Sequence, residues 1–590
     1  MRVANRLETI TPIGYPSRQI SRLVLAAAAL IATTGLAAAQ TVLPTDAKPT
    51  CTASAAEFDN WFASGTVTAN GVVDPASSLT FPNIPNCTFY KWSEQMFLWL
   101  TSPAPARYGG KSIVLDSPAF YDVSPPNSSG HRTLIPVTPG LRLFGPQISQ
   151  LGPLGQPVVF DESGKMFNVV RPQAGPTGKP VVQNKAGEAV EIAHTLVGPN
   201  GRPVLLDSAG NAINFQTQAN GAPLLLDRTG KAINLQLNMI VANGRIFFLD
   251  GNGNAIETEQ GQADGSVLMT QSKKLVYYAL SVNDVYAYFM TGTKNGGITP
   301  APTQFPTTAA ELTAIETFAL AHSKTFPDPD ALTVEVKSAW IEAAGLPNLN
   351  EYITIEATIP TYDTSNPLKW VPTGTKQAQM ALVGIHVVGS AAGHPEMLWA
   401  TFENVNNTRN AQYSYTTASN ATKTVAQNNG GTWTFSTTPP SATPNNPLMS
   451  MNGADIVASS PPTPIGPSDI LRMDAWGTSS SSGVFTANNT DIISINNNVL
   501  GQLLAGDVRK NYVLTGTTWT AFGKVPPPGP GQVVGTNQMA NSTMESFEQP
   551  SNCFECHDGS NMLGGTRTSG GVVTGTGLSH IYGVLTPLFP

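Results

Sequence analysis

The sequence contains few charged residues. Asp, Glu, Lys and Arg make up 12% of its 590 residues, against about 25% in an ordinary soluble protein. The formal net charge is −7, and Lys and Arg form no cluster along the chain. Because nucleic-acid phosphates bind concentrated positive charge, this composition argues against a nucleic-acid-binding protein. Glycine (54) and proline (48) are abundant instead, which is typical of a turn-rich, mainly β protein.

Long apolar runs are lacking after the first forty residues. Residues 23–39 form one apolar run of small side chains that ends in Ala-Ala-Ala before Gln40. A basic stretch precedes this run, with arginines at Arg2, Arg6, Arg18 and Arg22. A basic region, an apolar region and a small-residue cleavage site are typical of a secretory signal peptide, and this run is short for a membrane span. We predict that residues 1–39 are removed and that the mature protein acts outside the cytoplasm without being an integral membrane protein.

Cysteine is scarce, with four residues at Cys51, Cys87, Cys553 and Cys556. Because unpaired thiols are a liability in an oxidising compartment, we predict a disulfide between the first two. Ser54 and Glu57 have the spacing of a capping box just after Cys51, and apolar residues recur at helical spacing after Cys87. The predicted disulfide therefore joins the starts of two short helices.

Five copies of one pattern occupy residues 151–258. Each copy has a glycine, an apolar run and a second glycine nine positions after the first; the first glycines are Gly155, Gly178, Gly201, Gly221 and Gly244. A period near 20 residues indicates a repeated supersecondary unit, and a D-x-x-G turn after a short apolar strand predicts a β-hairpin. We expect the hairpins to stack or roll into one sheet. The array could bind a glycan or a surface, or be a structural insertion.

The rest of the chain predicts a mainly β fold. Strand patterns with β-branched and aromatic enrichment occupy residues 274–290, 332–341, 351–362, 379–390 and 397–405. Thr308 and Glu311 have the spacing of a capping box, which predicts one helix among these strands. The pattern over residues 537–549 predicts a short helix that ends before Pro550. We expect an antiparallel β-sandwich or curled sheet with the hairpin array, a few short helices and a separate C-terminal segment.

The expected organisation has four parts after the signal peptide. Residues 40–150 form an N-terminal helical and irregular segment, residues 151–258 the repeats, and residues 259–524 the main β domain. Residues 525–590 form a linker and the C-terminal segment. Proline-rich loops lie at residues 436–447, 459–469 and 525–531.

The C-terminal segment carries the clearest chemical motif, Cys553-Phe554-Glu555-Cys556-His557. In C-x-x-C-H the two thiols bond to the vinyl groups of haem and the histidine is an axial ligand of the iron. A zinc site needs four ligands, but the other two cysteines, Cys51 and Cys87, are predicted to be bonded to each other. A thioredoxin-like pair needs a βαβ context, and the sequence around residue 553 does not have one. A plain disulfide between Cys553 and Cys556 leaves His557 without a role. We predict one covalent haem c, held by Cys553, Cys556 and His557.

Short blocks from about residue 330 to the C-terminus add a resemblance. CFECH resembles the attachment motif of c-type cytochromes, and NSTMESFEQPSNCFECH, VEVKSAW and HPEMLWATFENVNN are similar to large bacterial monohaem cytochrome c family proteins of unassigned function. The resemblance implies haem binding by Cys553, Cys556 and His557 and little more. The predicted signal peptide, rather than the resemblance, implies a periplasmic or secreted bacterial protein. Only 33 residues follow His557, so a small cytochrome c domain cannot be completed after the motif, and the preceding domains must cover the haem.

The sixth iron ligand has several candidates. His580 lies 23 residues after His557 and can reach the opposite face of the porphyrin, whereas Met562 is only five residues away and barely can. His386 is the alternative candidate; His386 and His394, the latter close to Glu396, could also form a metal site or the distal wall of a haem pocket. The same histidines could instead be ordinary hydrogen-bonded residues, and Met539 and Met544 core packing.

These observations predict an extracytoplasmic monohaem c-type cytochrome that transfers electrons to or from an unidentified redox partner protein. Two alternatives remain open. One is a haem enzyme, similar to a peroxidase or oxygenase, with an open sixth position. The other is a surface- or glycan-binding β protein with a secondary haem. The sequence contains no H-E-x-x-H, no G-x-S-x-G and no glycine-rich nucleotide loop.

Overall fold

Alternating apolar residues build one large antiparallel sheet at the centre of the fold. The structure is a computed structural model. It describes residues 43–125, 131–146, 158–160, 166–168, 181–192, 194–197, 203–207, 209–217, 224, 238–242, 245–249, 266–452, 454–477, 483–525, 533–547, 549, 553–557 and 575–590. The predicted signal peptide, residues 1–39, lies outside this part of the chain. Residues 43–590 belong to one compact unit.

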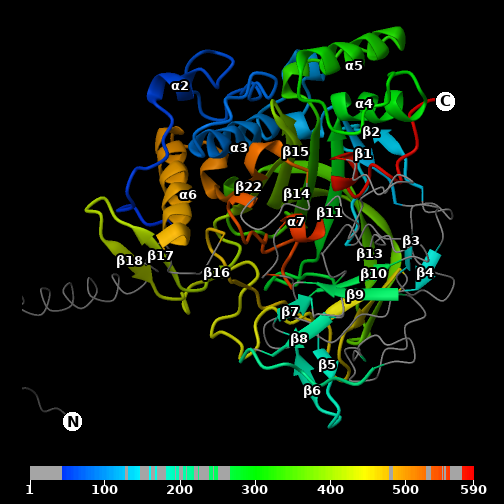
Figure 1. Cartoon of the computed structure of the whole chain (residues 1–590), viewed down its shortest axis with the longest axis vertical. Coiled ribbons are helices and arrows are strands. Elements are labelled where there is room, and N and C mark those ends of the chain that lie inside the picture. The colour runs from blue at the N-terminus through cyan, green and yellow to red at the C-terminus, as the bar shows by residue number, and fades with distance from the viewer. Residues whose placement is uncertain are drawn as a thin grey trace, which may run out of the picture. The chain divides into compact units, whose positions relative to one another are not determined.

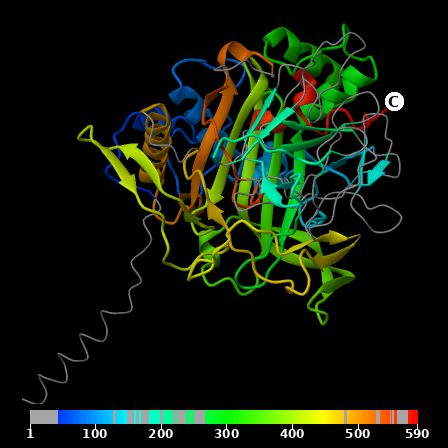
Figure 2. The same ribbon diagram turned by 60° about the horizontal axis from the view of Figure 1, so that its bottom comes forward.

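The main sheet contains eleven strands of the described residues. Its order is β2-β1-β11-β12-β14-β15-β22-β23, and β13 and β20 also pair with β14. The strands are β1 (Phe120–Val123), β2 (Leu134–Pro136), β11 (Val276–Asn283), β12 (Val334–Glu342), β13 (Thr354–Asp363), β14 (Lys369–Ala391), β15 (His394–Asn404), β19 (Met449–Asn452), β20 (Asp455–Ala458), β22 (Tyr512–Thr520) and β23 (Val533–Gly535). Figure 2 shows the long strands β14 and β15 running beside each other. The prediction of a mainly β, antiparallel fold is confirmed, in the form of one large sheet.

The register of the central strands decides which residues share a face. His386 of β14 lies opposite Lys337 of β12 and Thr401 of β15, and Val388 lies opposite Glu335 and Trp399. Because directly opposite residues point to the same face, these side chains lie on one side of the sheet. We call this side the polar face.

Helices cover the opposite face. The helix α3 (Cys87–Leu100) packs Phe97 on Phe402 of β15 with 4.3 Å between ring centroids. Trp92 of α3 lies against Gly389, where a Cβ atom would come within 3.0 Å of the indole. Helices α2 (Ala55–Asp59) and α6 (Gly483–Gln502) lie next to α3 (Figure 1). Sequence reasoning missed α6, whose Asn-rich face has no strong apolar period.

One predicted strand was wrong at its end, and one predicted helix was wrong in all of its described residues. The strand expected over residues 274–290 ends at Asn283, because the Asn283 side chain accepts a bond from the Tyr286 amide and caps the helix α4 (Asp284–Lys294). The helix expected over residues 537–549 is a series of turns in its described residues. There Asn541 accepts bonds from the amide and hydroxyl of Thr543, and such local bonds compete with helix formation.

Several N-terminal expectations are confirmed. Cys51 and Cys87 form a disulfide, with Cys87 as the first residue of α3. Ser54 and Glu57 form the capping box of α2. Thr308 and Glu311 do the same for α5 (Ala309–Ala321). The strand β1 pairs with β11, so the segment before residue 150 contributes to the main sheet.

The repeats form hairpins where the structure describes them. The strand pairs are β3 (Val158–Phe160) with β4 (Met166–Asn168), β5 (Val181–Gln183) with β6 (Ala189–Glu191), β7 (His194–Val197) with β8 (Pro203–Leu206), and β9 (Asn238–Ala242) with β10 (Arg245–Leu249). Asp207 accepts bonds from two amides of its turn, and Gly210 has φ +81°. The described copies form separate two-stranded sheets rather than the single sheet expected. The Gln183 amide donates to the Leu224 carbonyl and the Gln183 carbonyl accepts from the Gln216 amide, so the second copy is bonded to the fourth copy and to the residues just before it.

No helix among the described residues is long and apolar enough to cross a membrane.

Candidate functional site

The C-x-x-C-H motif forms one helical turn. Helix α7 spans Cys553–Cys556, and the amide of His557 donates to the carbonyl of Cys553 at 2.8 Å. Cys553 and Cys556 are the first and last residues of this turn. Phe554 is buried in the main core. The core therefore holds the turn that carries the motif in place.

His557 has a defined orientation. Its Nδ1 lies 2.8 Å from the carbonyl oxygen of Leu578. Because a carbonyl only accepts, Nδ1 carries the hydrogen, and Nε2 is the nitrogen with a lone pair. Burial, and then the neighbouring His580, hold the pKa of His557 well below its usual range. A neutral imidazole of fixed tautomer is the form that binds a metal ion.

His580 is in direct ring contact with His557. The two ring centroids lie 3.7 Å apart with 9° between the ring planes. His580 follows the short helix η7 (Gly575–Leu578), which also supplies the Leu578 carbonyl. In this stacked arrangement the rings present their faces to each other rather than their nitrogens. Two axial ligands of one haem iron lie on opposite faces of the porphyrin, so ligation by both histidines would require the two rings to move apart.

The polar face of the main sheet forms the wall behind the motif. The rings of Trp399 and His557 lie 4.3 Å apart, and Phe554 is edge-on to Trp399 at 6.0 Å. Gly384 of β14 lets the chain approach closely, because a Cβ atom there would lie 2.2 Å from the Thr543 hydroxyl. The segment before the motif thus lies directly on the strands (Figure 1).

His386 and His394 do not meet. His386 lies on the polar face, and its Nε2 donates to both carboxylate oxygens of Glu545 at 3.1 Å. The Nδ1 of His394 donates to the Glu396 carboxylate at 2.8 Å, and the His394 ring is edge-on to Phe89 of α3 at 5.0 Å. Because α3 covers the opposite face, a joint site of the two histidines is not formed. Among the described residues no group of three or more His, Cys, Asp and Glu side chains is arranged to hold a metal ion.

A buried ion pair anchors the segment before the motif. Glu403 of β15 pairs with Arg472 at 2.6 Å, and both side chains are almost fully buried. Glu403 also accepts a bond from the Ser542 amide at 2.7 Å and another from the Ser542 hydroxyl. Neither Glu403 nor Arg472 belongs to a recognisable motif. Sequence reasoning missed them because only the fold brings positions 403, 472 and 542 together.

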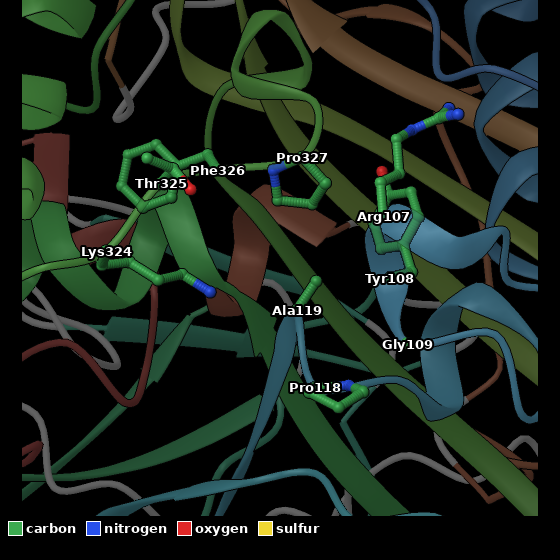
Figure 3. A pocket seen from close by; sticks show the side chains of 9 residues that line it. All are labelled: Arg107, Tyr108, Gly109, Pro118, Ala119, Lys324, Thr325, Phe326 and Pro327. Atoms are coloured by element: carbon green, nitrogen blue, oxygen red, sulfur yellow. The ribbon is translucent and has the colours of Figure 1, made fainter.

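A separate cavity of about 490 Å³ lies between the Lys324–Pro327 loop and the Arg107–Gly109 turn. Figure 3 shows the Lys324 amine directed toward Ala119, whereas the Arg107 guanidinium turns away from the other lining side chains. Lys324 pairs with Asp284 at 3.1 Å, and Arg107 pairs with Asp74 and Asp328. The cations of this cavity therefore have partners within the protein. No residue of the C-terminal segment lines it.

The residues present fit a c-type haem in their donor chemistry. Cys553 and Cys556 begin and end one helical turn, and the Leu578 carbonyl holds His557 in the tautomer that leaves Nε2 for iron. His580 supplies a second imidazole at the same place. Met539 and Met544 are buried in the main core, and Met562 lies outside the described residues.

Comparison of the chain with models of known families, with curated proteins and with solved structures finds no match.

Proposed function

We propose that this chain is a monohaem c-type cytochrome that transfers electrons outside the cytoplasm to or from a redox partner protein. The observation that carries the proposal is the contact of two histidines, His557 of the attachment motif and His580, beside a tryptophan-lined wall. A site with an imidazole for each axial position suits electron transfer, because it leaves no coordination position for a substrate.

Each residue of the site has a defined role in this proposal. Cys553 and Cys556 attach the group, and His557 binds the iron through Nε2. The Leu578 carbonyl holds His557 in its tautomer and raises its basicity as a ligand. Trp399 packs on the His557 ring and keeps water away from it, and Phe554 packs against Trp399. When bound, haem supplies a one-electron couple of its iron.

His580 is the candidate for the second axial position, and His386 is the alternative. The Nε2 of His386 donates to the Glu545 carboxylate. Because burial alone would raise the pKa of Glu545, it is the nearby His386 that brings this pKa below its usual range. A histidine engaged by a carboxylate in this way must give up that bond before Nε2 can bind iron. His580 is the candidate whose ring lies in contact with His557.

The signal-like residues 1–39 and the Cys51–Cys87 disulfide support a periplasmic or secreted location. Disulfides persist in oxidising compartments, and c-type haem is attached to a chain after its export.

The test is to produce the full chain in a bacterial host that attaches haem c. We expect one haem per chain by the pyridine haemochrome assay, a low-spin spectrum, no response to carbon monoxide, and reversible one-electron oxidation and reduction. The double variant Cys553→Ser, Cys556→Ser should lose covalent haem. A wild-type protein without haem would refute the proposal, and a high-spin haem that binds carbon monoxide would favour a haem enzyme instead.

A further inference from the structure

Ser579 lies between two residues of the site. Leu578, just before it, provides the carbonyl that accepts a bond from His557, and His580 follows directly. The Ser579 side chain is buried, with 1% of the residue exposed. A movement of Ser579 would therefore move both contacts of the site. It would shift the Leu578 carbonyl that binds His557, and it would shift His580, which is the next residue.

Two side chains hold the Ser579 hydroxyl. Its Oγ donates to Oε2 of Glu335 at 2.6 Å, and it lies 2.8 Å from the hydroxyl of Tyr286. A serine hydroxyl has one hydrogen, and an ionised carboxylate only accepts. Ser579 therefore donates to Glu335 and accepts from Tyr286. Burial, and then the charge of Glu335, raise the pKa of Tyr286 well above its usual range, so the phenol keeps the hydrogen it donates.

The two anchors come from different elements of the core. Glu335 belongs to β12 and points to the polar face, because it lies opposite Val388 of β14, which in turn lies opposite Trp399 of β15. Tyr286 belongs to α4, is fully buried, and packs its ring on Phe305 at 5.6 Å. A hydroxyl that bonds to two fixed groups in different directions has little freedom to move.

We propose that Ser579, held by Glu335 and Tyr286, is the positioning residue that sets both histidines of the site. It fixes the Leu578 carbonyl that orients His557, and it determines how far His580 can turn from its stacked position. The inference rests on the proposed function, because it assigns a role toward a haem iron that His557 and His580 bind. Outer hydrogen-bond partners of metal ligands commonly change metal affinity or activity by 10- to 100-fold.

The experiment compares Ser579→Ala, Ser579→Thr and Tyr286→Phe in the full haem-loaded chain. In Ser579→Ala we expect a high-spin signal in the electron paramagnetic resonance spectrum, carbon monoxide binding that the wild type does not show, and a higher reduction potential. Tyr286→Phe keeps the ring and removes only the donor, so we expect the same changes at smaller size. Ser579→Thr keeps the hydroxyl, so its spectrum should remain that of the wild type.

Thr586→Val is the matched control. Thr586 lies in the same C-terminal segment, and its hydroxyl donates to the Arg132 carbonyl at 3.1 Å, away from the histidines. We expect this variant to keep the wild-type spectrum and potential. If Thr586→Val changes them as much as Ser579→Ala does, general loosening of the segment explains the effect and the inference is wrong.

The experiment distinguishes the role of Ser579 from the proposed function. If the wild type carries low-spin haem and neither Ser579→Ala nor Tyr286→Phe changes the spectrum, carbon monoxide binding or potential, the role of Ser579 is refuted while the proposed function stands. If Ser579→Ala does not fold, Tyr286→Phe decides the question. A wild-type chain without haem would overturn both.

Discussion

The imidazole of His580 lies face to face with that of His557, with 3.7 Å between ring centroids. This contact joins the attachment motif to the last residues of the chain. Because Leu578 holds His557 through Nδ1, His580 is the ring that would have to move away from this contact for a second nitrogen to bind an iron at His557.

Replacing the two candidate histidines should separate their roles. We expect His580→Ala to convert a low-spin haem into one that is high-spin and binds carbon monoxide, because it removes the second axial imidazole. The matched variant His386→Ala removes the same side chain from a position bonded to Glu545, and it should keep the low-spin spectrum. Optical and magnetic spectra of the two variants check this. The opposite pattern would make His386 the sixth ligand.

Breaking the buried ion pair of Glu403 should destabilise the fold. In Glu403→Gln the buried guanidinium of Arg472 loses its charged partner, and we expect a loss of about 3–5 kcal/mol in the free energy of unfolding. Urea unfolding measures this loss. The exposed pair of Lys376 and Glu342 is the control, and Lys376→Met should cost less than about 1 kcal/mol. Equal losses in the two variants would contradict a structural role of the buried pair.

The pH dependence of stability should contain a contribution from Glu94. This carboxyl is buried in α3, its Oε1 has no hydrogen-bond partner in the described part of the chain, and burial raises its pKa to about 8. Between its usual pKa and this value the folded state holds a proton that the unfolded state has lost, so stability falls as the pH rises, by about 1.4 kcal/mol per unit. Below this window the contribution is fully present.

Glu94→Gln removes this titration. We expect the variant to gain stability over the wild type as the pH rises from about 5 to 8, because its amide stays neutral. Urea midpoints measured across this range check the expectation. Parallel curves for the two proteins would show that the Glu94 carboxyl does not change its proton binding on folding.

Removing the disulfide should lower stability without affecting the site. The disulfide joins residues 36 positions apart, and the loop-closure model gives about 4 kcal/mol for this length. It lies at the start of α3, on the face of the sheet opposite the motif. We therefore expect Cys51→Ala, Cys87→Ala to unfold at lower temperature in calorimetry while its haem spectrum stays that of the wild type. A changed spectrum would show that the two faces are coupled.

Local patterns predicted the elements that depend on neighbouring residues. The strands over 332–341 and 351–362, the caps at Ser54 and Thr308, and the turn glycine Gly210 are all found. Each depends on residues within a few positions of each other, so the sequence contains all the physical information. The strand predicted over 274–290 is wrong at its end. The apolar pattern continues from β11 into α4, and only the Asn283 cap separates the two elements.

The sequence by itself determined the mainly β composition, the hairpin repeats and the C-x-x-C-H spacing, since these are properties of neighbouring residues. Only the tertiary structure decided which face of the sheet receives the motif and which histidine lies beside His557. Glu335 and Ser579 are 244 positions apart, and His386 and Glu545 are 159 apart. Their meeting depends on strand register, where a shift of one residue would turn Glu335, Lys337 and His386 to the other face.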